Sequence, residues 1–172
     1  MFYCSFVCLV FGLDFCFPQV VGLFCGRLEW QFHFATGPRR FVSSDGYAML
    51  VGRDDDENDE LTIRMARGND VFLHASGYAG SHVIIRRSDE REIPTRTLVE
   101  AAQLAAHYSK AKTLGRVEVS WTPRKFVSKP RGAKPGLVML SRHKTIVVRP
   151  DAALVRDLKE KTERAPSDEN GD

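Results

Sequence analysis

Cysteine is missing from most of this chain. The four cysteines, Cys4, Cys8, Cys16 and Cys25, all lie near the start, so disulfides cannot cross-link the long remainder. None of their gaps has the Cys-x-x-Cys spacing of a zinc site, and we expect no metal there.

A long uninterrupted apolar run is also missing. Residues 1–36 begin with an apolar stretch that Asp14 and Pro18 interrupt, whereas a membrane-spanning helix needs about 20 consecutive apolar residues. The stretch also lacks the Lys or Arg that precedes the apolar part of a secretory signal. Three interpretations stay open for residues 1–36: a signal peptide or anchor, an organelle-targeting segment, and a non-native or remnant extension.

The usual sequence motifs of enzymes are lacking as well. The chain has no P-loop, no nucleophile elbow and no Gly-x-Gly-x-x-Gly after a strand. We therefore expect a protein that is not an enzyme, with no catalytic residue, no cofactor, no bound metal and no small-molecule substrate.

What the chain does have is an uneven distribution of charge. Its net charge is only +3, yet residues 107–149 hold eleven Lys and Arg against a single acid, Glu118. A local excess of positive charge attracts polyanions. Nucleic acid is therefore the expected partner.

The first half of the expected domain reads as strands with one short helix. Asp45-Gly46 suits a tight turn between two strands, and residues 71–73 and 83–85 are short apolar runs on either side of a Gly-rich loop. Between them, an acidic run precedes a short helix that we expect to be capped by Asn58 and to reach Met65.

The second half is expected to contain the main helix. It follows Pro94, starts with Thr97 and Glu100 as a capping box, and ends near Gly115. Residues 117–121 alternate as a strand, a Pro-rich cationic loop follows, and residues 137–140 and 145–148 read as the last strands.

The expected fold class is α+β, a small mixed or antiparallel sheet packed against one main helix and a short acidic helix. We place the domain at residues 37–150. Residues 151–172 are expected to be a charged, disordered tail, because a helix there would have few apolar anchors.

The cationic loop is the first candidate site. It carries Arg124, Lys125, Lys129, Arg131 and Lys134, and three prolines stiffen it, which would reduce the entropy lost when RNA phosphates bind. The alternative is a solvated surface loop. Other basic residues that could extend the RNA-binding surface are Lys110, Lys112, Arg116, Arg86 and Arg87, with Arg142 and Lys144 adding charge of the same sign.

Histidines and aromatic residues allow more than one interpretation. His74 and His82 could contact RNA phosphates, could bond the loop backbone, or could join Asp70 in a hydrolytic centre. Phe72 and Trp121 could stack on bases, but their strand patterns favour core positions. Tyr78 lies in a Gly-rich loop, and we expect either role there.

Several short motifs occur in an order that resembles the NFACT-R family. They are RRFVSSDGY, LVGR, NDELT, DVFLH, GSHVIIR and VSKPRGAKPGLV, from about Arg39 to Pro150. The resemblance implies an RNA-binding domain of the kind found at the C-terminal end of RqcH- and NEMF-type ribosome quality-control factors. Those factors act on a stalled large subunit beside peptidyl-tRNA. The implied partners are tRNA or ribosomal RNA and the large ribosomal subunit, in the cytoplasm.

The family motifs match particular residues of this chain. They cover Asn58-Asp59-Glu60, Asp70 with His74, Gly80-Ser81-His82, and the Lys-Pro loop from Lys129 to Gly136. Phe72, Ala79 and Trp121 depart from the family's usual Trp, Pro and Tyr.

The other domains of the full-length factors do not fit into residues 1–36. The resemblance is therefore to stand-alone or truncated members, and a separate chain would have to supply the rest. Two other hypotheses stay open: a nucleic-acid hydrolase that uses His74, His82 and Asp70, and a nucleic-acid sensor tethered to a membrane by the N-terminal segment.

Overall fold

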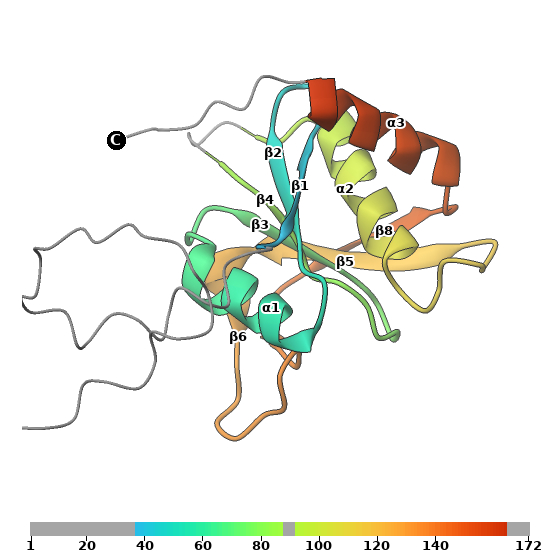
Figure 1. Ribbon diagram of the computed structural model, residues 1–172. Coiled ribbons are helices and arrows are strands. Elements are labelled where there is room, and N and C mark those ends of the chain that lie inside the picture. Colours follow the sequence, from blue (N-terminus) through green and yellow to red (C-terminus); the bar gives the residue numbers. More distant parts are fainter. Residues whose placement is uncertain (1–36, 88–91, 165–172) are drawn as a thin grey trace, which may run out of the picture. The chain divides into compact units, whose positions relative to one another are not determined.

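The computed structural model describes residues 37–87 and 92–164. Its centre is a six-stranded antiparallel sheet in the order β1-β2-β4-β3-β5-β8 (Figure 1). The strands are β1 (Arg39–Val42), β2 (Ala48–Val51), β3 (Val71–Ala75), β4 (Val83–Ile85), β5 (Val117–Pro123) and β8 (Lys144–Val148). A separate two-stranded ribbon joins β6 (Val127–Ser128) to β7 (Met139–Leu140).

Helices cover both faces of the sheet. The long helices α2 (Thr95–His107) and α3 (Ala152–Arg164) lie on one side, and α1 (Asp55–Asp59) lies on the other with the β6–β7 ribbon below it (Figure 1). A π-helix, η1 (Glu60–Met65), continues α1, and a 3-10 turn, η2 (Arg124–Phe126), links β5 to β6. The predicted α+β class is confirmed. Within the described ranges no helix is long and apolar enough to span a membrane.

Strand alternation divides the core into two layers. Val71, Leu73 and Ala75 of β3 face the alanine-rich side of α2, and the small side chains there let the helix approach the sheet closely. Phe72 faces the other way and packs with Leu61 of η1 and Val127 of β6. The α1–η1 segment and the β6–β7 ribbon are therefore attached to the sheet by a core of their own.

The β1–β2 hairpin forms where it was predicted. Gly46 takes a φ of 84°, a left-handed conformation that Gly adopts without the cost of a Cβ clash. The predicted capping box on α2 is wrong. Thr97 donates to Asp45 at 2.7 Å, and Glu100 accepts from the backbone N–H of Ser44 at 2.8 Å, so both side chains hold this hairpin instead.

The boundaries of two predicted helices are also corrected. The short acidic helix is capped by Asp54, whose carboxylate accepts from the N–H of Glu57, while Asn58 is buried inside it. The main helix ends at His107 and not near Gly115, because the chain turns at Tyr108 and continues through turns up to β5.

The prediction of a disordered C-terminal tail is wrong for residues 152–164, which form α3. Val155 and Leu158 are buried in the main core, and Thr162 accepts a hydrogen bond from the N–H of Val42 at 2.9 Å on the outer strand β1. Tertiary packing supplies the stability that this segment lacks as an isolated helix. The predictions for residues 1–36 and 165–172 lie outside the described residues.

Candidate nucleic-acid interface

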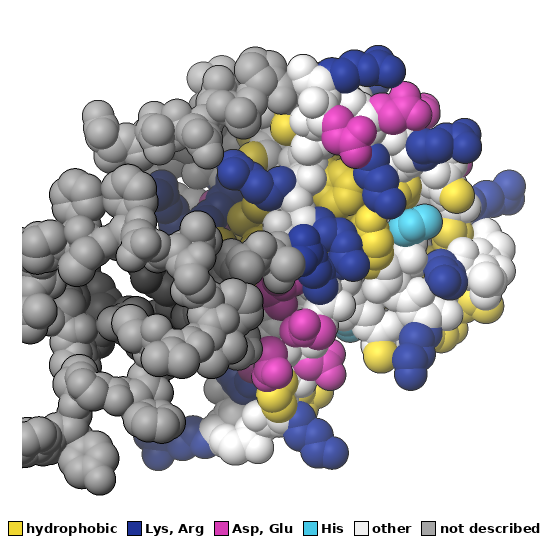
Figure 2. Space-filling view, viewed as in Figure 1, with side chains coloured by type: hydrophobic (Ala, Val, Ile, Leu, Met, Phe, Trp, Pro, Cys, Tyr) yellow, Lys and Arg dark blue, Asp and Glu magenta, His cyan; other side chains and the backbone are white. Residues whose placement is uncertain are grey.

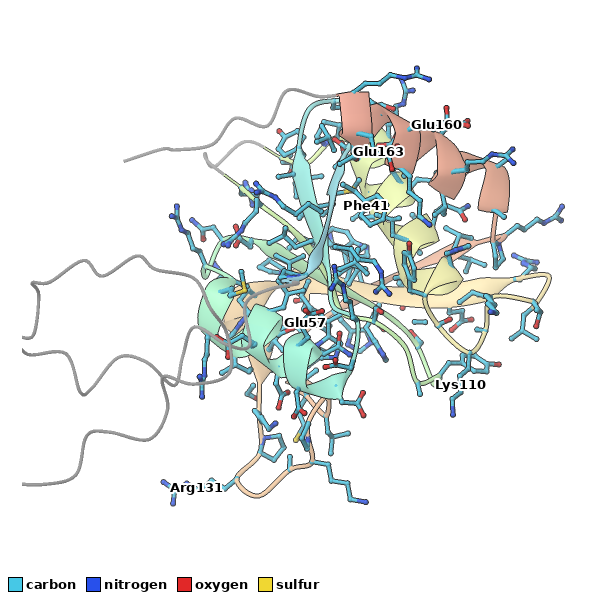
Figure 3. The ribbon with its side chains drawn as sticks, in the orientation of Figure 1. Phe41, Glu57, Lys110, Arg131, Glu160 and Glu163 are labelled. Atoms are coloured by element: carbon cyan, nitrogen blue, oxygen red, sulfur yellow. The ribbon has the colours of Figure 1, made fainter. Side chains whose placement is uncertain are left out.

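The loop between β6 and β7 is fastened to α1 by one carboxylate. Asp59 forms an ion pair with Lys129 at the start of the loop, and its Oδ1 accepts from the backbone N–H of Gly136 at its end, 3.1 Å away. The loop therefore projects from a closed base. Figure 3 places Arg131 at its outer end.

A buried network fixes the part of α1 that carries this carboxylate. Asn58 accepts from the N–H of His82 at 2.8 Å through Oδ1 and donates to the carbonyl of Gly80 at 3.3 Å. The ring of His82 lies 2.8 Å from the hydroxyl of Thr62 in η1. The Asn-Asp-Glu helix and the Gly-Ser-His turn are thus joined inside the domain.

His82 is 1% exposed and therefore offers no surface for the predicted RNA contact. Burial, and to a smaller extent the neighbouring His74, lowers its pKa from 6.5 to about 4. Backbone hydrogen bonds to Asn58 and Gly136 and the negative charge of Asp59 oppose this shift of the pKa only in part. The neutral ring is a structural element of the network.

This shift predicts a loss of stability in mild acid. Above pH 6.5 both states hold neutral His82; as the pH falls towards 4, only the unfolded chain gains the proton, so the folded state becomes less favourable. The free energy of unfolding, measured with urea, should fall by about 2 kcal/mol between about pH 7 and pH 5 from this residue. A His82→Gln variant should show a flatter pH profile, and the exposed control His143→Gln should not. Equal slopes for His82→Gln and the wild type would contradict the assignment.

His74 is also largely internal. Its ring packs perpendicular to that of His82 with the centroids 5.3 Å apart, and burial lowers its pKa, against a backbone hydrogen bond to Gly80 that raises it. Asp70 does not join the two histidines. Its fully buried carboxylate accepts from the backbone N–H groups of Arg67 and Arg87 and pairs with Arg86 at 3.0 Å. The hydrolytic centre proposed from the sequence is not assembled.

Two of the predicted RNA-binding arginines serve the fold. Arg124 donates to the carbonyls of Thr62 and Ile63 in η1 and to the carbonyl of Val127 in β6, and so links these two elements. Arg86 donates to the carbonyl of Met65 at 2.8 Å besides its ion pair with Asp70. Arg87 is half-buried beside it.

The remaining predicted cations fall into two groups at opposite ends of β5. Lys110, Lys112 and Arg116 lie in the connection before the strand, whereas the loop cations follow it. Seven residues of extended chain separate the ends by roughly 20 Å. Figure 3 shows the separation, with Lys110 on one side of the molecule and Arg131 on the other.

Aromatic rings hold several cations in place beyond the loop. The Lys125 amine and the Arg142 guanidinium lie 5.4 and 5.5 Å from the ring centre of Phe126, and the Lys144 amine lies 5.2 Å from that of Trp121. Cation–π contact leaves the polar N–H groups available for other partners. Phe72 is fully buried and Trp121 packs against the core, as their strand patterns predicted, while Tyr78 is 43% exposed.

We call the exposed cations on the loop side of β5 the loop-side basic surface. None of them forms an ion pair with an acid among the described residues. The surface consists of Lys125, Arg131, Lys134, Arg142 and Lys144. Figure 2 shows acidic side chains over α1 and basic side chains below them, towards the tip of the loop.

Comparison with known families decides what this domain is. The model of the NFACT protein RNA binding domain matches residues 38–142. The chain belongs to this family.

The relatives of this NFACT domain are much longer proteins. Rqc2 homolog RqcH of Bacillus subtilis is 43% identical over 119 residues, which cover 69% of this chain and 20% of that protein. Ribosome quality control complex subunit NEMF of Homo sapiens is 31% identical over 81 residues, which cover 47% of this chain and 8% of that protein. The chain thus spans about a fifth or less of the length of these two relatives.

A solved structure shares the fold of the NFACT domain. It is the C-terminal of the fibronectin/fibrinogen-binding protein from Streptococcus suis, with a TM-score of 0.67 and 35% identity, and the match covers 71% of this chain and 49% of that one.

The sequence motifs of the NFACT domain therefore include residues that stabilise the fold as well as residues on its surface. Asn58 and His82 join α1 to the Gly-Ser-His turn. Asp59 joins α1 to Lys129 and Gly136 of the β6–β7 loop. From the sequence, Arg142 and Lys144 were expected only to add positive charge; in the structure each lies against an aromatic ring. Neither contact with an aromatic ring can be read from the sequence, because Arg142 lies far along the chain from Phe126 and the pairing of Lys144 with Trp121 depends on the β5–β8 register.

Proposed function

We propose that this chain is an RNA-binding module for tRNA or the RNA of the large ribosomal subunit, acting in the cytoplasm in the quality control of stalled translation. Membership of the NFACT RNA-binding family supports the RNA partner, and the names of the RqcH and NEMF relatives support the ribosomal setting.

The single observation that carries the proposal is the loop-side basic surface. Its cations have no acidic partners within the described ranges, and a fastened loop and two aromatic rings restrain them. Restrained cations lose less conformational entropy when they meet phosphates, and each phosphate contact releases counterions. Backbone contacts of this kind give affinity for folded RNA with little reading of base sequence.

Neutralising the tip of the loop tests the proposal. An Arg131→Gln, Lys134→Gln double variant should bind tRNA about tenfold more weakly at low salt, and the slope of log affinity against log salt should become shallower by about 1.5. Fluorescence anisotropy with labelled tRNA at several salt concentrations measures both. The control is Arg156→Gln with Lys159→Gln, two exposed cations of α3. Equal losses in the two variants would contradict a localised RNA surface.

A further inference from the structure

An acid lies at the base of the loop that carries the cations. Asp59 would repel an RNA phosphate if it acted only as a charge, since like charges at close range are unfavourable. Its side chain is nevertheless 20% exposed and directed at the loop, while the partner Lys129 is 26% exposed. A carboxylate at this position is compatible with RNA binding if its contacts with the loop favour binding more than its charge opposes it.

The two oxygens of Asp59 hold the two ends of one loop. One pairs with Lys129 Nζ, and the other accepts from the N–H of Gly136, seven residues later. Gly136 has a φ of 76°, and a Cβ there would lie 2.9 Å from Oδ1 of Asp55, so the end of the loop lies directly against α1. The residues between these two contacts include both cations of the tip, Arg131 and Lys134.

The carboxylate itself is held by the core. Asn58, next to it, is 2% exposed and bonds the Gly-Ser-His turn, and Leu61 of η1 is fully buried against the sheet. Asp59 therefore links the exposed loop to a segment whose position is fixed by the folded core. Lys129, which the sequence suggested as an RNA contact, is part of this fastening.

We propose that Asp59 is a positioning residue for RNA recognition, an acid whose loss weakens the binding of a polyanion. This proposal rests on the proposed function. With Asp59 in place, Arg131 and Lys134 are presented from a closed loop; without it, the loop has to be ordered each time RNA binds.

A purely electrostatic role and a positioning role of Asp59 predict opposite effects of the same substitution on RNA affinity. Asp59→Asn removes a negative charge beside a basic surface, so electrostatics alone predicts tighter RNA binding. If the carboxylate positions the loop, affinity falls by about tenfold, because two long side chains and their backbone lose more freedom on binding. Asp56→Asn is the matched control, an exposed acid on the same helix, and it should bind RNA equally well or slightly better than wild type.

Trypsin gives a readout of the loop that needs no RNA. Lys129 and Lys134 each precede a proline, which trypsin does not cleave, so Arg131-Gly132 is the one cleavable bond between residues 129 and 136. Cleavage there should be at least about fivefold faster in Asp59→Asn than in wild type or Asp56→Asn, since a released loop fits a protease better than a fastened one.

The effect should also depend on Lys129. Adding Asp59→Asn to a Lys129→Gln variant should lower RNA affinity by less than half as much as the same substitution does in the wild type. The reason is that the ion pair is already absent. Should Asp59→Asn fail to fold, as judged by circular dichroism, Lys129→Gln breaks the same pair, and its cleavage rate tests the fastening.

The outcomes separate this proposal from the proposed function. Unchanged or tighter tRNA binding by folded Asp59→Asn overturns the positioning role, whatever the cleavage rate. Weaker binding together with faster cleavage supports it. A wild-type protein that binds no tRNA or ribosomal RNA overturns both proposals. If the wild type binds RNA and Asp59→Asn binds it equally well, only this proposal is overturned.

Discussion

Reversal of the whole loop-side basic surface to glutamate is expected to lower RNA affinity by at least about 1000-fold at low salt. The reason is that five phosphate-facing cations become five repelling anions, and the release of counterions that drives binding is lost. The substitutions are Lys125→Glu, Arg131→Glu, Lys134→Glu, Arg142→Glu and Lys144→Glu. Filter binding with tRNA, and co-sedimentation with large ribosomal subunits, measure the effect.

The control has to carry the same change in net charge. Five exposed cations away from this surface, reversed together, provide it: Arg40, Arg149, Arg156, Lys159 and Arg164. The control should retain binding within about tenfold, since screened charges more than a Debye length of roughly 8 Å away act weakly. If both variants lose binding equally, the protein has a general affinity for polyanions and no defined RNA surface.

Replacing Asp70 with Ala is expected to destabilise the domain by about 3–5 kcal/mol. The carboxylate is fully buried, and its removal leaves the N–H groups of Arg67 and Arg87 without their acceptor and Arg86 without its ion pair. Urea unfolding followed by fluorescence measures the change. Asp157→Ala, at an exposed acid of α3, should change stability by less than about 0.5 kcal/mol.

The same variant bears on the hydrolase hypothesis. If Asp70 served catalysis, its replacement would abolish an activity and leave stability nearly unchanged, whereas a structural carboxylate gives the reverse. A loss below about 1 kcal/mol would show that the three contacts of Asp70 matter less than their burial implies.

Local patterns predicted the sheet well because strand alternation and turn chemistry act over short distances. Val71 and Leu73 alternate with Phe72 across the sheet, and Asp45-Gly46 forms the predicted turn. The helix ends were predicted less well. Thr97 and Glu100 have the spacing of a capping box, but hairpin residues about 50 positions earlier compete for the same side chains.

The sequence indicated which basic residues belong to the loop, but it did not indicate what each of them contacts. Arg124 and Lys129 look like the other loop cations in the sequence, yet one binds carbonyls of η1 and the other pairs with an acid 70 residues away. The type of a side chain does not reveal a distant partner. Proline content predicted a stiff loop, whereas the fastening by Asp59 depends on the packing of α1 against the sheet and could not be predicted from it.

The position of β8 and α3 has a practical consequence for anyone who dissects this domain. The family match stops at residue 142, before both elements. A recombinant fragment cut there would remove Val148 and Ile146, the β8 residues opposite Val117 and Val119, and so uncover the long edge of β5. Bare strand edges of this kind template intermolecular pairing. Self-association of such a fragment would then be mistaken for a property of the intact protein.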